Sequence, residues 1–362
     1  MINVLFIIPY PLKKAPSQRF RFEQYISFLE KNEVACHFSS FIDEKTWSIL
    51  YHEGKTLQKF WGTVKGFFKR LFIVFTFHKY DVLFIHREAC FIGPAFFESL
   101  YAKVFKKKII YDFDDAIWLH DVSDANSKLG WLKNPSKTAK IIKNASLIFA
   151  GNSYLANYAQ HFNKNVIVIP TTIDLNYHVA ENKSQQSTIV IGWTGSYTTI
   201  KHFEQAIPIL AKLKTKFPHI QIHLISNKPS DNNEIEIQFI PWKKETEIED
   251  LSTFDIGIMP LPDDDWAKGK CGFKGLQYMS LSIPTVMSPV GVNTEIITDG
   301  VNGFLAKNEK EWIEKLSLLI ENEQLRKEIG EKGYQTILQN YSVESQKNKY
   351  LSAFKSISSL AK

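Results

Sequence analysis

Two lysines in the second half of the sequence are well placed to bind a phosphate group. Lys270 lies in a loop that contains glycine, and Lys274 follows in the first turn of a helix that we expect at 273–281. The loop comes after a short apolar segment, 255–259, which we expect to be a buried strand. Such a loop supplies cations, backbone N–H groups and the positive end of a helix dipole. The alternative is that both lysines are solvated surface residues.

A second glycine-containing segment, Ile191-Gly-Trp-Thr-Gly-Ser196, ends another expected strand. Gly195 and Ser196 would leave room there for phosphate oxygens, although a plain turn into the next helix explains them as well. The Gly-x-Gly-x-x-Gly fingerprint of dinucleotide-binding domains is absent, and so is a Walker-type loop. The segment therefore indicates phosphate binding only together with the lysine loop.

Acidic and histidine side chains follow two strands expected in the first half. Asp112, Asp114 and Asp115 come after the strand at 108–111, and His86 ends the strand at 81–86. Carboxylates there would orient sugar hydroxyls or bind a divalent metal, whereas an aspartate can also simply cap a helix. A histidine there would act as a general base or would be hydrogen-bonded in the domain interior. We take Asp114, Asp115 and His86 as the candidate catalytic residues.

Three arginines are candidates for binding an anionic acceptor. Arg19 and Arg21 begin a helix expected at 19–29 after the first strand, and Arg87 follows His86. The alternative for the first two is an exposed helix start. A further acidic cluster, Asp263-Asp-Asp265, is expected to be mainly a solvated loop.

The overall composition is that of a globular protein. The 362 residues are 44% hydrophobic and 23% charged, and this length predicts two domains. The three cysteines are widely spaced, which favours a reducing compartment and gives no metal-ligand spacing. The first residues lack the basic start of a secretory signal, and the apolar run 71–77 is too short to span a bilayer. We therefore expect a cytoplasmic protein.

Short apolar strands alternate with helical segments along the chain, which predicts parallel α/β sheets. We expect a first domain at 1–175, a linker at 176–187, a second domain at 188–340 and a C-terminal helix at 341–362 that packs on the first domain. The expected strands of the first domain are 3–8, 34–38, 81–86, 108–111, 146–150 and 166–169. Those of the second are 188–193, 220–225, 235–240, 255–259 and 285–287. The expected helices of the second domain and C-terminus are 201–217, 245–251, 273–281, 309–320, 324–339 and 343–360.

Positive charge is concentrated in the first half. Residues 1–175 contain 23 Lys and Arg against 15 Asp and Glu, and the segments 55–80 and 125–173 contain no acidic residue. The segment 55–80 is also rich in aromatic residues, so it suits a helix lying on an anionic membrane. An ordinary helix that buries its aromatics is an equal alternative. Single-stranded nucleic acid would also fit such a segment, but no nucleic-acid motif supports it.

Several segments, in their order along the chain, resemble GT-B-fold glycosyltransferases of the large family 4, also called glycosyl transferases group 1. The similar segments include 4–11, 17–21, 112–118, 151–155, 169–174, 192–196, 270–291 and 298–305. The resemblance implies two Rossmann-like, doubly wound domains facing each other across a cleft. It also implies a nucleotide-sugar donor bound by the second domain and an acceptor bound by the first.

In this family resemblance, Lys270 and Lys274 would hold the donor diphosphate without a metal or another cofactor. The family usually has a Glu-x7-Glu pattern, but the corresponding positions here hold Gly269 and Gln277. Gln277 would still hydrogen-bond a ribose hydroxyl, as a neutral group. The family typically retains anomeric configuration in hexosyl transfer, yet no nucleophilic carboxylate emerges from the sequence, so the stereochemical route stays open.

The function we expect is transfer of a sugar from a nucleotide-sugar to a glycan or lipid-linked acceptor in surface-polysaccharide assembly. It would take place in the cytoplasm or peripherally on the inner face of the membrane. Three alternatives stay open: a nucleotide-sugar epimerase of the same fold, a non-catalytic glycan- or membrane-binding partner, and a metal-dependent transferase that uses Asp112-Phe-Asp114.

Overall fold

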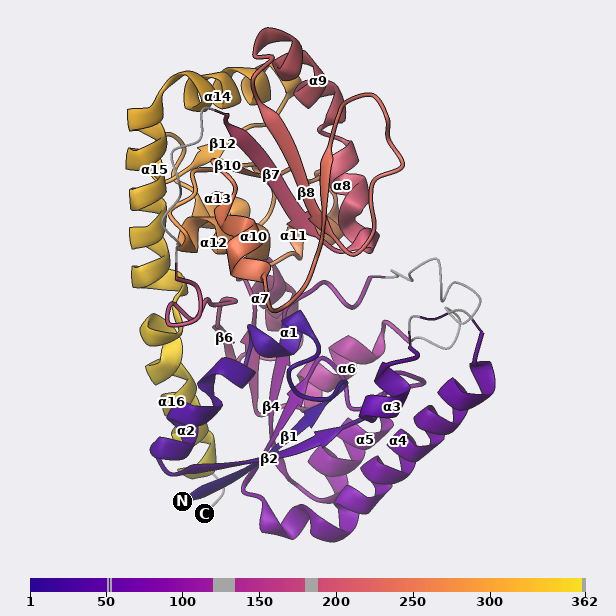
Figure 1. Ribbon diagram of the computed structural model, residues 1–362. Coiled ribbons are helices and arrows are strands. Elements are labelled where there is room, and N and C mark those ends of the chain that lie inside the picture. The colour runs from indigo at the N-terminus through magenta and orange to yellow at the C-terminus, as the bar shows by residue number, and fades with distance from the viewer. Residues whose placement is uncertain (51, 53, 120–133, 180–187, 360–362) are drawn as a thin grey trace. The chain divides into compact units, whose positions relative to one another are not determined.

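The computed structural model describes residues 1–50, 52, 54–119, 134–179 and 188–359 (Figure 1). The chain divides into two compact units, one made of residues 1–171 and 346–362 and the other of residues 172–345. Part of the expected linker, 180–187, lies outside the described residues, as do the last three residues of the expected C-terminal segment.

The first unit is built on a parallel sheet whose described strands run in the order β2-β1-β3-β4-β5-β6. The strands are β1 (Ile2–Ile8), β2 (Val34–Ser40), β3 (Val82–His86), β4 (Lys108–Phe113), β5 (Leu147–Ala150) and β6 (Val166–Val168). Every residue of β3 and β5 is buried, which is typical of parallel strands covered by helices on both faces.

Helices flank this sheet, and one of them comes from the end of the chain. They are α1 (Pro16–Arg19), α2 (Ile26–Lys31), α3 (Glu44–Trp47), α4 (Thr56–Thr76), α5 (Phe96–Ser99), α6 (Lys137–Asn144), α7 (Ser153–Gln160) and α16 (Val343–Ser359). In α16 the ring of Tyr350 stacks on Tyr25 at 4.2 Å between centroids, and Phe354 lies 6.0 Å from Phe84. The C-terminal helix therefore contributes aromatic residues to the core of the first unit.

The second unit has a parallel sheet in the order β12-β11-β10-β7-β8-β9. Its strands are β7 (Val190–Gly195), β8 (Gln221–Ser226), β9 (Gln238–Pro241), β10 (Ile256–Met259), β11 (Thr285–Met287) and β12 (Phe304–Leu305). Its helices are α8 (Ile200–Glu204), α9 (Ile207–Lys216), α10 (Glu247–Ser252), α11 (Asp265–Lys268), α12 (Phe273–Ser280), α13 (Asn293–Ile296), α14 (Glu309–Glu321) and α15 (Glu323–Thr336).

The strands agree with the sequence predictions to within a few residues, whereas several helices differ. The helix expected at 19–29 is divided into α1, a 3-10 turn at Glu23–Tyr25 and α2. The helix expected at 201–217 breaks between α8 and α9, where Pro208 occupies the first turn of α9. Proline has no N–H to donate to the preceding turn, so it begins a helix more readily than it continues one. The two-residue strand β12 was not predicted.

Each sheet has one place where the winding of the chain reverses. In the first unit it lies between β1 and β3, and in the second it lies between β7 and β10. Open α/β sheets bind ligands beyond the carboxyl ends of the two strands at this reversal. We therefore expect ligand-binding sites at the loops that follow β1, β3, β7 and β10.

Candidate functional site

In the second unit, the segments predicted to bind phosphate follow the two strands at the reversal. Gly195 ends β7, and the loop that carries Lys270 follows β10 and leads into α12. Segments about 75 residues apart in sequence are thus brought to one edge of the sheet by the pairing of β7 with β10. The sequence patterns predicted both elements, and the topology places them together.

The side chain of Lys274 passes over Gly195. A Cβ at position 195 would lie 2.8 Å from the Cε atom of Lys274 and would overlap the indole ring of Trp193. The ammonium group of Lys274 lies 5.1 Å from the centroid of this indole, which is fully buried. Gly195 is therefore needed for close packing at this point, and the indole ring positions the lysine through a cation–π contact.

Lys270 is placed in a similar way by a second tryptophan. Its ammonium group lies 4.6 Å from the ring centroid of Trp266, in α11. The nearby acidic cluster has structural partners, because Asp264 caps α11 through the backbone N–H of Ala267 at 2.7 Å. Asp263 and Asp265 each lie 3.5 Å from Lys268.

A buried histidine that the sequence analysis did not single out lies near these lysines. His202, in α8, is only 5% exposed, and its Nδ1 atom has no hydrogen-bond partner. Burial lowers its pKa, and the positive charges of Lys274, Lys201 and Lys270 lower it further, to about 4. The imidazole is therefore neutral near pH 7. Its lowered pKa indicates that the electrostatic potential at this position is positive. The only hint in the sequence is its place just after β7, beside Lys201.

The first turn of α12 adds to this positive potential. Its N-cap residue is Gly272, at φ +69°, which provides no side-chain acceptor for the helix N-terminus. A Cβ at position 272 would overlap the side chain of Ile296, so both the backbone conformation and the packing require glycine here. The helix thus presents its positive dipole end, together with Lys274, at the carboxyl edge of the sheet.

Gln277 lies one turn further along α12 and is paired with a carboxylate. Its Nε2 donates to Oε1 of Glu247 at 3.3 Å, and the indole N–H of Trp242 donates to the same oxygen at 3.2 Å. Both Gln277 and Glu247 are buried. A glutamate at position 277 would place two carboxylates in contact, so the neighbour in α10 accounts physically for the amide. Glu247 gave no sequence signal because it is 30 residues from Gln277.

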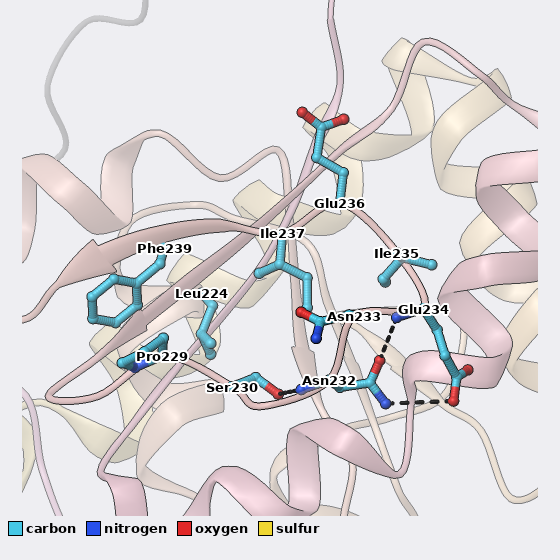
Figure 2. Close-up of a pocket in the computed structure, with 10 residues that line it drawn as sticks. All are labelled: Leu224, Pro229, Ser230, Asn232, Asn233, Glu234, Ile235, Glu236, Ile237 and Phe239. Carbon is cyan, nitrogen blue, oxygen red and sulfur yellow. Dashed lines mark hydrogen bonds between the residues drawn. The ribbon is translucent and has the colours of Figure 1, made fainter.

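The other predicted donor residue, Ser196, is exposed. Its hydroxyl lies 2.9 Å from that of Thr198, in the turn that leads to α8. A surface pocket of the second unit lies elsewhere, between β8, β9 and the loop that joins them (Figure 2). It contains Glu234 and Glu236 but no basic residue and none of the predicted donor residues. Its charge is unsuited to a diphosphate.

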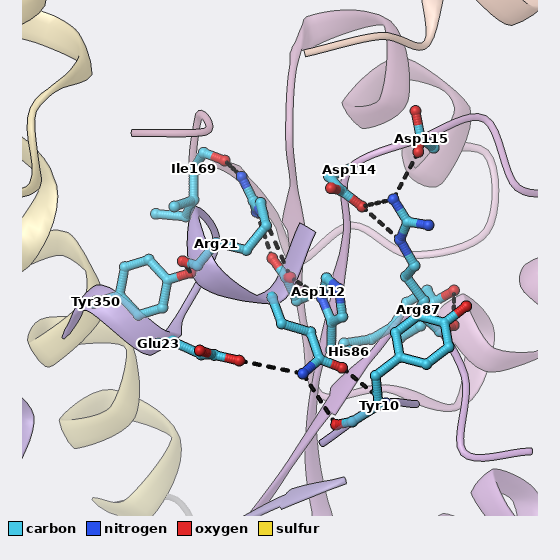
Figure 3. Close-up of polar contacts among 12 residues, drawn as sticks. Tyr10, Arg21, Glu23, His86, Arg87, Asp112, Asp114, Asp115, Ile169 and Tyr350 are labelled. Carbon is cyan, nitrogen blue, oxygen red and sulfur yellow. Dashed lines mark hydrogen bonds and ion pairs between the residues drawn. The ribbon is translucent and has the colours of Figure 1, made fainter. Parts of the chain in front are cut away.

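In the first unit, three of the predicted polar residues form one buried network (Figure 3). Asp112 is bound on one side by the guanidinium of Arg21 and on the other by Nδ1 of His86, at 2.7 Å. All three side chains are completely buried, and Arg21 also donates to the carbonyl oxygen of Ile169. Burial alone would raise the pKa of Asp112, but Arg21 and His86 outweigh it and hold that pKa below its usual range.

A second, partly exposed set lies beside it. Arg87 binds Asp114 at 2.8 Å and Asp115 at 2.6 Å, and its side chain is 24% exposed. Its φ of +59° is unusual for a residue other than glycine, and its carbonyl oxygen accepts a hydrogen bond from Tyr111. Burial would raise the pKa of Asp114, yet Arg87 and His86 together lower it. The ion pairs with Arg87 therefore orient both carboxylates, and the lowered pKa of Asp114 favours its ionised form.

The residues predicted for catalysis and for acceptor binding fall into two sets, one completely buried and one partly exposed. Arg21 and His86 belong to the buried network, so in this conformation neither reaches a ligand directly. Arg87 follows β3, one of the two strands at the reversal, and Asp114 and Asp115 follow the neighbouring strand β4. Arg87 and Asp115 are partly exposed. Arg19 is half-buried, with its guanidinium 5.0 Å from the ring of Phe20. Their assignments to catalysis and acceptor binding stay predictions.

Within the described parts of the chain, no group of three or more His, Cys, Asp and Glu side chains is arranged to hold a metal ion. Asp112, which the metal-dependent alternative requires, has its carboxylate occupied by Arg21 and His86. The described helices also include none that is long and apolar enough to cross a membrane.

The second unit matches a known protein family. Residues 188–322 match the model of the family described as glycosyl transferases group 1. A 64-residue segment is 42% identical to a protein of Methanocaldococcus jannaschii described as an uncharacterized glycosyltransferase, and the match covers 17% of this chain and 18% of that protein. The predicted resemblance to group 1 is confirmed, while membership of family 4 in particular stays a prediction.

Solved structures share the fold over nearly the whole chain. Sucrose-phosphate synthase of Thermosynechococcus elongatus has a TM-score of 0.71 at 10% identity, covering 99% of this chain and 100% of its own. A glycosyltransferase of Rickettsia africae has a TM-score of 0.71 at 14% identity, covering 98% of each chain. Anabaena HepE, solved with UDP and glucose, has a TM-score of 0.67 at 14% identity, covering 98% of this chain and 100% of its own. The expected α/β fold of GT-B type is confirmed.

Proposed function

We propose that this chain, whose residues 188–322 are a glycosyl transferases group 1 domain, transfers a hexose from a nucleotide-sugar to a glycan or lipid-linked acceptor. One observation carries the proposal: Lys274 lies over Gly195 where β7 and β10 meet, with Lys270 and the N-terminus of α12 close by in sequence and fold. This arrangement suits the diphosphate of a nucleotide-sugar.

The chemistry follows from where charge develops. When the bond between the sugar and the diphosphate breaks, the leaving nucleoside diphosphate gains negative charge. Lys270, Lys274 and the positive end of α12 are held in place before the reaction, so they stabilise that charge without reorganising and without a metal. Retention of anomeric configuration is the outcome we propose by analogy with the family.

Similar structures support a nucleotide-sugar as the donor class. HepE of Anabaena has been solved with UDP-glucose as well as with UDP, and TarM of Staphylococcus aureus with Fondaparinux, alpha-GlcNAc-glycerol and UDP. For this chain, UDP-sugars are therefore the first donors to test. We extend the proposal to surface-polysaccharide assembly in the cytoplasm, with the first unit binding the acceptor.

A thermal-shift screen of UDP- and GDP-sugars tests the donor site. We expect at least one nucleotide-sugar to stabilise the protein, and Lys270→Ala and Lys274→Ala to reduce that shift. Lys212→Ala is the matched control, because Lys212 lies on α9 in an exposed pair with Glu309. An unchanged shift in both site variants would refute the assignment of the diphosphate.

Product analysis separates the alternatives. A transferase releases UDP or GDP only in proportion to sugar added to an acceptor, whereas an epimerase converts its nucleotide-sugar with no acceptor present. A non-catalytic partner would neither transfer nor epimerise, and binding of neither UDP nor GDP in isothermal titration would favour it. Full activity in EDTA is expected, and a loss restored by a divalent cation would support the metal-dependent alternative.

A further inference from the structure

The longest helix of the first unit is fixed to the domain by an unusual face. The buried residues of α4 are Gly62, Gly66, Arg70 and Ile73, whose spacing of three and four places them on one side of the helix. A Cβ at Gly62 would overlap Thr46, and one at Gly66 would lie 2.6 Å from the carbonyl oxygen of Phe41. Small residues thus let the helix backbone lie close against the domain.

Arg70 anchors the same face. Its guanidinium group donates to the carbonyl oxygens of Ala89 at 2.6 Å, Ile8 at 2.9 Å and Ser39 at 3.2 Å, and the side chain is completely buried. These bonds join α4 to β1, β2 and the segment after β3. The rotation of the helix about its own axis is therefore fixed, and so is the face that it presents to solvent.

The opposite face of α4 is apolar and exposed. Its large side chains are 42–72% exposed: Leu57, Phe60, Trp61, Phe67, Phe68, Phe72 and Phe75. At about 100° per residue they occupy an arc of roughly 140°, directly opposite the buried glycines. Soluble proteins rarely leave such a continuous apolar surface uncovered, so this outer face of α4 indicates a binding surface.

The charges around this face favour an anionic lipid surface over a second copy of the chain. Residues 55–80 contain no acidic side chain, and Lys65 and Lys69 border one side of the outer face of α4. A symmetric dimer through this face would place a second segment without acidic side chains against the first, so these lysines would gain no opposite charge. An anionic lipid surface instead accepts the aromatic residues among its acyl chains and the lysines among its headgroups.

We propose that the outer face of α4 docks the first unit on an anionic membrane surface, with the helix lying in the plane of the interface. Nearby residues extend the basic region. The ring centroid of Phe105 lies 4.5 Å from that of Phe77, just after α4, and Lys106, Lys107 and Lys108 follow Phe105. This proposal is independent of the donor chemistry, because no donor residue lies in α4.

Flotation of the full-length protein with vesicles tests the proposal. We expect it to float at low salt with equal parts of phosphatidylcholine and phosphatidylglycerol, and several-fold less with phosphatidylcholine alone or at high salt. The variant Phe68→Glu/Phe72→Glu should stay in solution. Both side chains are more than half exposed, so the variant should unfold at the same temperature as the wild type. Leu318→Glu/Leu338→Glu, which alters exposed leucines of the second unit, is the matched control and should float normally.

Trp61 provides a direct test of insertion. Phosphatidylcholine with brominated acyl chains should quench part of the tryptophan fluorescence of vesicle-bound protein, and Trp61→Phe should remove that part while leaving flotation intact. The proposal is overturned if the wild type stays in solution with anionic vesicles at low salt, or if Phe68→Glu/Phe72→Glu floats normally. A dimer in sedimentation that this variant dissociates, without vesicle binding by the wild type, would assign the face to a second copy instead.

Discussion

The side-chain amide of Gln277 donates to the carboxylate of Glu247 at 3.3 Å, and both groups are buried in the second unit. The family resemblance implies a glutamate at position 277. The contact with Glu247 explains why glutamine is compatible with this position. The amide donates to a buried carboxyl group, whereas a second carboxyl group at this position would supply no amide donor.

Replacing Gln277 by glutamate should therefore destabilise the protein. Gln277→Glu brings two buried carboxylates together and removes a donor, and we expect a loss of about 2 kcal/mol in the free energy of unfolding at pH 7. Urea unfolding measures this loss. The double variant Gln277→Glu/Glu247→Gln exchanges the two groups and should recover most of the stability. No recovery would mean that the contact between α10 and α12 is not what determines the residue at 277.

The contact between Gly195 and Lys274 leads to a prediction on binding. A methyl group at position 195 would overlap the ring of Trp193 and displace the lysine side chain. We expect Gly195→Ala and Lys274→Ala each to weaken nucleotide binding roughly 10- to 150-fold, because one charge-assisted contact to phosphate contributes about 1.5–3 kcal/mol. Isothermal titration with UDP measures the affinity. If Gly195→Ala binds UDP like the wild type while Lys274→Ala does not, the glycine is not required to position the lysine.

The sequence predicted the strands well because parallel strands covered on both faces are short apolar segments, as in β3 and β5. It also placed the segments predicted to bind phosphate at strand ends. It could not show that β7 pairs with β10, because strand order depends on contacts between distant segments. For the same reason it could not pair Gln277 with Glu247 or bring His202 near the lysines.

The helix α4 shows a different limit. Its pattern of aromatic residues is compatible with a membrane face and with an ordinary buried face, and the usual rule that the apolar side of a helix points inward favours the second. The structure buries Gly62, Gly66 and Arg70 instead, because hydrogen bonds from Arg70 and the close approach at the glycines fix that side to the domain. Burial of the aromatic side was thus the wrong alternative.

His202 makes stability depend on pH in a defined direction. Its folded-state pKa of about 4 lies below the unfolded value near 6.5, so protonation favours unfolding, and the contribution is complete above pH 6.5 and lost as the pH falls towards 4. Because one pKa unit corresponds to about 1.4 kcal/mol, the full effect expected is on the order of 3 kcal/mol. Urea unfolding of the wild type and His202→Gln at pH 7.5 and 4.5 should give a smaller difference between the two pH values in the variant. Equal differences would show that other groups account for the acid sensitivity.

The buried network of the first unit indicates that Arg21 contributes to stability and not to acceptor binding. Arg21 was predicted to bind an acceptor, but in the structure its guanidinium satisfies Asp112 and leaves no exposed surface. Arg21→Met should therefore cost about 3–5 kcal/mol in the free energy of unfolding, because it leaves Asp112 as a buried carboxylate with only His86 beside it. Adding Asp112→Asn to this variant removes the uncompensated charge and should restore part of the stability. Urea unfolding measures both effects. If Arg21→Met instead unfolds like the wild type and raises only the KM for the acceptor, the arginine is a recognition residue and must leave the network when the acceptor binds.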